Sequence, residues 1–122
     1  MLREIIRALR GSDTLSRMIA QIGEMLDAGG WMFEKAVDSM MHEIDWAEIA
    51  NDLYAKDKRI NEIEQTVREE IVTHLSLGHD SDLTACLVLM NVVKDAERIG
   101  DYCKNIFEIG RFYRHEFQRP EY

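Results

Sequence analysis

Turn-forming residues and long apolar runs are both scarce in this chain. One proline and seven glycines among 122 residues argue against a barrel or sandwich, which needs a turn about every dozen residues. The longest wholly apolar run covers six residues, 85–90, whereas a transmembrane helix needs about twenty. Three arginines and a glutamate among the first ten residues leave no room for a signal-peptide core. We therefore expect a cytoplasmic protein with no integral membrane segment.

Basic residues and cysteines are few as well. Fifteen basic against twenty-three acidic residues give a net charge of −8, so we expect no nucleic-acid partner. Cys86 and Cys103 lie 17 residues apart on what reads as one helix, roughly 25 Å at 1.5 Å per residue. That distance excludes a bridge between them, and both are expected to be buried thiols.

Apolar residues recur at helical spacing along most of the chain, which predicts an all-α fold. The expected helices cover residues 13–42, 45–76 and 80–117, in an antiparallel up-down-up bundle. An N-terminal arm, 1–12, precedes this single bundle domain, 13–122. With arginines beside an apolar side, the arm is compatible with peripheral contact to a membrane or transporter, although packing on the bundle or a dimer mate is the more common arrangement.

Local signals mark the helix ends. Asp45 followed by Glu48 favours a helix start, and Gly78 suits a helix end. The pair Gly29-Gly30 weakens the first helix, but the apolar period resumes after it, so we predict one long helix, with two helices as the alternative. Its predicted apolar stripe includes Leu15, Met18, Ile19, Ile22, Met25, Leu26, Met32, Phe33 and Ala36.

Polar residues also follow one face of the second and third helices: Asp57, Asn61 and Glu64 on the second, Glu97 and Asp101 on the third. If the chain reverses about residues 78–79, Asp57 faces Asp101 and Asn61 faces Glu97. Carboxylates this close repel, so one stays protonated unless a hard cation or bridging arginines relieve the repulsion. The alternative is a solvated face with ordinary ion pairs to Arg59, Arg68 and Arg98.

The string KDAERIGDYCKNIFEI, residues 94–109, resembles the signature of the PhoU family, and DKRINEIEQTVREEI, residues 57–71, is similar to its partner motif. The resemblance implies a three-helix bundle, usually two per chain. It also implies a regulator of phosphate homeostasis that links a phosphate transporter to a sensor kinase. Several members of the family bind metal clusters through paired acidic motifs on neighbouring helices.

Carried over by position, the metal motifs are Glu97 with Asp101, and Asp57 with Asn61, and Glu64 is a possible additional ligand. Asn61 stands where the family usually has aspartate, so the affinity for a hard cation should be lower. The resemblance implies a divalent or ferric ion or cluster of iron, manganese, zinc or magnesium. A homodimer would restore the usual two bundles, and Gly100 would allow the neighbouring helix to approach closely.

The expected function is therefore non-enzymatic regulation of phosphate uptake by contact with a transporter subunit, a sensor kinase or both. Two alternatives remain at this point: a metal-dependent enzyme built on the same carboxylates, and a dimerising helical scaffold without metal. No HExxH motif and no phosphate-binding glycine-rich loop occur, and we expect no catalytic residues.

Overall fold

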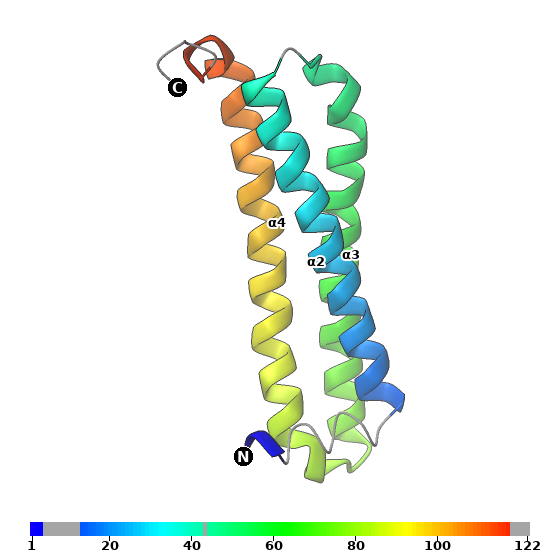
Figure 1. The fold of residues 1–122 in the computed structure, drawn as a ribbon. Helices are drawn as coiled ribbons and strands as arrows, with labels where there is room; N and C mark the ends of the chain where they lie inside the picture. Colours follow the sequence, from blue (N-terminus) through cyan, green and yellow to red (C-terminus); the bar gives the residue numbers. More distant parts are fainter. Residues whose placement is uncertain (4–12, 43, 118–122) are drawn as a thin grey trace.

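The computed structural model describes residues 1–3, 13–42 and 44–117, without the side chains of residues 114–117. Three long helices dominate this part: α2 (Asp13–Met41), α3 (Trp46–Ser76) and α4 (Leu83–Phe117), with a short 3-10 helix, η1 (Asp80–Asp82), before α4. They run up, down and up (Figure 1), and the described ranges contain no strand. The predicted all-α antiparallel bundle is confirmed. Most of the predicted arm, residues 4–12, lies outside the described residues.

Both ends of α3 lie where the sequence signals place them. The Asp45 side chain accepts a hydrogen bond from the Ala47 backbone N–H at 3.1 Å, as an N-cap does. At the other end, Gly78 has φ +89°, and its N–H donates to the Leu75 carbonyl at 3.2 Å. The third helix begins as η1, so α4 itself starts at Leu83 and not at residue 80.

Helix α2 continues through Gly29-Gly30 without interruption, as predicted. Gly29 is buried against α4: a Cβ on it would lie 3.5 Å from Ile99, and its carbonyl accepts a hydrogen bond from Cys103 Sγ at 3.6 Å. Cys86 and Cys103 are both free and buried, and burial raises the pKa of each thiol. The predicted buried thiols are confirmed.

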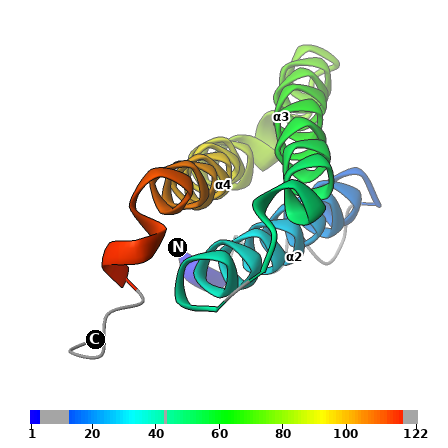
Figure 2. The ribbon, with the colours of Figure 1, turned by 90° about the horizontal axis from the view of Figure 1, so that it is seen from above.

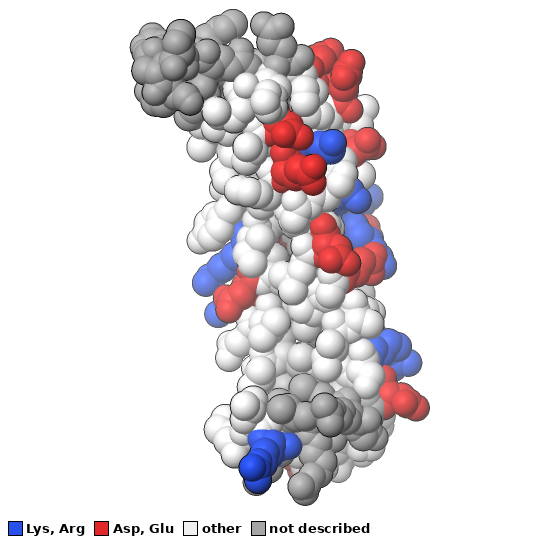
Figure 3. Space-filling view, viewed as in Figure 1, with Lys and Arg blue, Asp and Glu red and all other residues white. Residues whose placement is uncertain are grey.

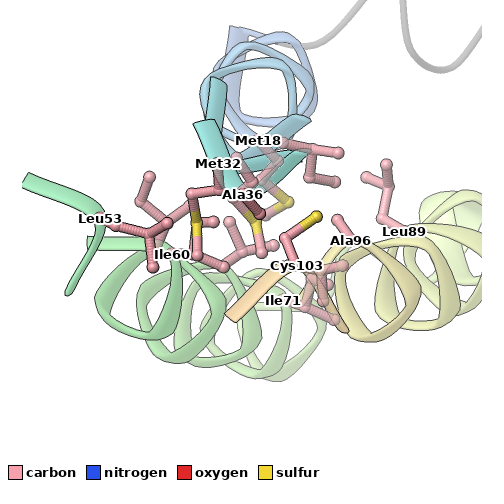
Figure 4. Packing of buried hydrophobic residues seen from close by; sticks show 14 of the residues in the cluster. Met18, Met32, Ala36, Leu53, Ile60, Ile71, Leu89, Ala96 and Cys103 are labelled. Atoms are coloured by element: carbon pink, nitrogen blue, oxygen red, sulfur yellow. The ribbon is translucent and has the colours of Figure 1, made fainter. Parts of the chain in front are cut away.

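The core lies along the axis enclosed by the three helices, within the part of the chain that the structure describes (Figure 4). At one end Phe107 is fully buried and stacks on Trp46 with ring centroids 5.0 Å apart. Helix α4 departs from helical geometry at Tyr113 (φ −115°, ψ 19°), and its last turn bends away from the bundle (Figure 2). Within the described ranges, no helix combines the length and the apolarity that crossing a membrane requires.

The predicted apolar stripe of α2 is too wide. Ile19, Leu26 and Phe33 are 41%, 46% and 52% exposed. The buried positions of α2 alternate by three and four residues, which gives a narrow seam: Leu15, Met18, Ile22, Met25, Gly29, Met32, Ala36 and Ser39. The two neighbouring helices cover only that seam. Ile19, Leu26 and Phe33, each of which directly follows a buried methionine in the sequence, therefore stay at the surface.

Candidate functional site

The predicted site residues of α3 lie at the edge of its buried face. Ile60 and Ile63 are in the core, and this fixes the rotation of the helix about its axis. The side chains of Asp57 and Glu64 are consequently only 13% and 18% exposed, and Asn61 between them is half-buried. These polar groups therefore lie against the neighbouring helix and not in bulk water.

Helix α4 supplies the facing residues. Ala96 and Cys103 are buried in the core. Glu97, the residue after Ala96, therefore lies at the edge of the buried face of α4 and is half-buried. Asp101 lies one turn further along and its side chain is 43% exposed. The two helices together bring four acids to one side of the bundle. We call these the carboxylate cluster: Asp57, Glu64, Glu97 and Asp101.

A lysine joins the two sides of the carboxylate cluster. Lys104 Nζ is 3.4 Å from Asp57 Oδ2 and 3.9 Å from Asp101 Oδ1. Both carboxylates therefore face one ammonium group, as expected if Asp57 and Asp101 lie on the same side of the bundle. The sequence interpretation missed Lys104, although its spacing of three residues from Asp101 on one helix is a signal for such a pair.

Helices α3 and α4 approach closely where Gly100 faces Ile60, because a Cβ on Gly100 would be 3.0 Å from Ile60 Cδ1. This contact lies within two residues of position 98, which a reversal about residues 78–79 places opposite Ile60. Gly100 permits the close approach that was expected of it.

Electrostatic repulsion is concentrated on Glu97. Burial raises the pKa of Glu97 to about 7, with help from a hydrogen bond to the Asp101 side chain and from the charges of Asp101, Glu64 and Asp57. The proton on this carboxyl is therefore held to a higher pH than on a free glutamate. The direction of this shift is the one expected for an acid that lies among other carboxylates.

The arginines divide between two faces. Arg68 Nε is 3.4 Å from Glu64 Oε1, so it partly neutralises the carboxylate cluster. Arg59 instead makes a two-pronged contact with Glu24 of α2, at 2.9 and 3.2 Å, and fastens α2 to α3. Arg59 Nη1 is also 3.9 Å from Glu62 Oε2, so Arg59 makes the ordinary exposed ion pairs of the alternative interpretation, but with acids outside the carboxylate cluster.

Oxygen donors of this kind suit a hard cation. A cation would replace the Glu97 proton and compete with Lys104 for Asp57 and Asp101. In the described ranges, however, the cluster does not yet hold three carboxylates whose ligand atoms all lie within 4.8 Å of one another. Binding therefore requires side chains to rotate, which the partial exposure of Asp101 allows.

Fold and site define the chain as a three-helix bundle with acidic side chains on the seam between its last two helices. The PhoU domain family matches residues 22–110, and the chain belongs to this family.

Two curated relatives come from Caulobacter vibrioides, one from strain NA1000/CB15N and one from strain ATCC 19089/CB 15. Each is a phosphate-specific transport system accessory protein PhoU homolog, 33% identical to this chain over 60 residues. The alignment spans 49% of this chain but only 26% of each relative. No solved structure matches the chain significantly.

Proposed function

We propose that this chain regulates phosphate uptake by protein–protein contact, without catalysing a reaction. The observation that carries the proposal is the PhoU domain, which spans residues 22–110 and contains both acidic segments. Similarity to accessory proteins of phosphate-specific transport systems supports it further. The partners we propose are a phosphate transporter subunit and a sensor kinase, contacted in the cytoplasm.

The regulatory role is tested by affinity capture of the tagged chain with the transporter subunits and the sensor kinase of the same cell, at low and at high phosphate. We expect at least one of these proteins to be retained, in an amount that changes with phosphate. Retention of neither at both phosphate levels would contradict the proposal.

We also propose that the carboxylate cluster binds a divalent or ferric cation, with Asn61 as a neutral oxygen donor. The repulsion at Glu97 supports this, because a cation would remove it. The neutral amide of Asn61 and the nearby Lys104 both reduce the negative charge that a cation meets, so we expect weaker binding than by a site with four carboxylates.

Elemental analysis after loading with iron, manganese, zinc or magnesium tests this metal site. We expect Glu97→Ala and Asp101→Ala to retain less metal than the wild type. Asp95→Ala is a matched control, because Asp95 is an exposed acid on the same helix outside the carboxylate cluster. Wild-type protein that retains no metal, or equal retention by all variants, would rule out the site.

A homodimer is the third part of the proposal. Ile19, Leu26 and Phe33 recur every seven residues on α2, and Val92 and Ile99 do so on α4. We call these five exposed residues the apolar face. The Ile99 side chain of α4 lies next to Gly29 of α2, so the exposed apolar residues of the two helices are neighbours. Figure 3 shows an uncharged band along α2 and α4, with charged side chains mainly at its edges. A second copy of the chain would cover this band and supply a second bundle.

A further inference from the structure

Three side chains that are able to ligate a metal lie close together at the end of the bundle where the chain passes from α3 to α4. Ligand atoms of His74, His79 and Asp82 all lie within 4.8 Å of one another. His74 is 7% exposed, and its Nε2 is 2.7 Å from Asp82 Oδ2. The exposed ring of His79 stacks on His74, with centroids 4.3 Å apart and planes within 7°.

The turn creates this arrangement. Gly78, at φ +89°, ends α3, and η1 then carries the chain back so that Asp82 returns to the level of His74. The Asp82 N–H donates to the His79 carbonyl at 3.0 Å, which fixes the turn between these two residues. His79 and Asp82 are three residues apart, but His74 is five and eight residues from them and lies on another helix, so helical periodicity alone does not reveal the group.

We propose that His74, His79 and Asp82 form a binding site for a borderline divalent transition metal of the zinc class. Two imidazoles and a carboxylate are a donor set that zinc accepts, with water or a further ligand in the fourth position. In tetrahedral zinc sites the ligand atoms are about 3.3 Å apart. The distance between His74 Nε2 and Asp82 Oδ2 would increase slightly as the cation replaces the hydrogen that they share. The exposed His79 side chain is able to rotate towards the cation.

A second observation at the same place supports a cation. A cavity of about 410 Å³ is lined by His74, His79 and Glu70, together with Arg17 and three threonines. Oε2 of Glu70 is buried and has no hydrogen-bond partner within the described structure. A buried carboxylate oxygen without a donor is costly, and a water bound to the metal would satisfy it. Glu70 itself is outside the group of ligand atoms that lie within 4.8 Å of one another, so we do not count it as a ligand. Glu70 precedes His74 by one helical turn and therefore lies on the same side of α3.

This site is separate from the carboxylate cluster. Asp82 and Glu97 are fifteen residues apart, which is roughly 22 Å along the helix at 1.5 Å per residue. The donor sets also differ, since imidazoles favour zinc and its neighbours, whereas carboxylates and amides favour harder cations. The two sites can therefore be tested independently.

The test is titration of the chain with Co²⁺, followed by visible absorption, and then displacement by Zn²⁺ followed by calorimetry. We expect one tight site per chain. His79→Ala should weaken Zn²⁺ binding about tenfold or more, because losing even a residue that only hydrogen-bonds to a metal ligand has an effect of that size. His79 is exposed, so this variant keeps the His74–Asp82 contact and the fold, which circular dichroism verifies. His42→Ala and Asp80→Asn are controls for a remote imidazole and for a charge in the same turn, and both should bind as the wild type does.

Ring resonances of His74 and His79 provide a second measurement, and both should shift on addition of Zn²⁺. Equal affinity in the wild type and His79→Ala, or no saturable binding to the wild type, would overturn the proposal. Loss of Zn²⁺ in Asp101→Asn but not in His79→Ala would place the metal at the carboxylate cluster instead. That result would reject this site and leave the proposed role of the cluster standing.

Discussion

At the scale of single residues, Glu97 is the group whose environment departs most clearly from that of a free side chain. It combines partial burial with three acidic neighbours, and its pKa rises to about 7 from an ordinary value of 4.5. Between these two values the folded chain holds a proton that the unfolded chain has released. The free energy of unfolding of the metal-free protein therefore falls as pH rises through this window.

Glu97→Gln should remove this dependence. Glutamine does not ionise, so we expect the variant to be more stable than the wild type at pH 8 and the difference to shrink towards pH 5. Thermal unfolding at both pH values, with a chelator present, measures the effect. A wild type that gains stability relative to the variant between pH 5 and pH 8 would contradict it.

Two glycines should respond to alanine in opposite directions. Gly30 lies inside α2 with no atom near its missing Cβ, so Gly30→Ala should stabilise the protein by about 0.5–1 kcal/mol through helix propensity. Gly78 has φ +89°, where a Cβ is strained, so Gly78→Ala should cost about 1–2 kcal/mol. Urea unfolding of both variants measures the pair, and changes of the same sign would refute this account.

At the scale of elements, α3 and α4 approach closely because Gly100 leaves room for Ile60. Ile60 is 1% exposed and lies at the centre of this contact. The same contact fixes the rotation of both helices and so sets which polar residues meet. Core packing therefore determines the positions of the acids in the carboxylate cluster, in addition to the interactions between their charges.

Ile60→Ala should cost about 2–5 kcal/mol in the free energy of unfolding, because it leaves a cavity between the two helices. Val72→Ala on the same helix is the control: Val72 is 59% exposed, and a change within about 0.5 kcal/mol is expected. Denaturant unfolding followed by circular dichroism compares them. Similar losses in both variants would show that the α3–α4 contact is not a centre of stability.

At the scale of the whole molecule, the bundle leaves its apolar face uncovered. Leu26→Glu and Phe33→Glu place charges at the centre of this face without touching the core, since both side chains are about half exposed. We expect the wild type to scatter light as twice 14.2 kDa at micromolar concentration, and both variants as a monomer with helical content unchanged.

Val72→Glu introduces the same charge on α3, outside the apolar face, and should leave the dimer intact. A wild type that scatters as a single chain throughout the micromolar range would reject the dimer. So would variants at Leu26 and Phe33 that associate as strongly as the wild type.

The three helices, the Asp45 cap and the stop at Gly78 could be predicted from sequence, because each depends on residues within about one helical turn. The burial of both thiols was expected from the general preference of cysteine for protein interiors. Helical spacing also assigned Asp57 and Glu64 to one side of α3, and Glu97 and Asp101 to one side of α4. The three-dimensional arrangement was needed to see that Lys104 lies between Asp57 and Asp101, that Phe33 is exposed and that His74 contacts Asp82. Those features depend on how the turn through η1 is built and on which seam the neighbouring helices cover, and no local pattern contains either.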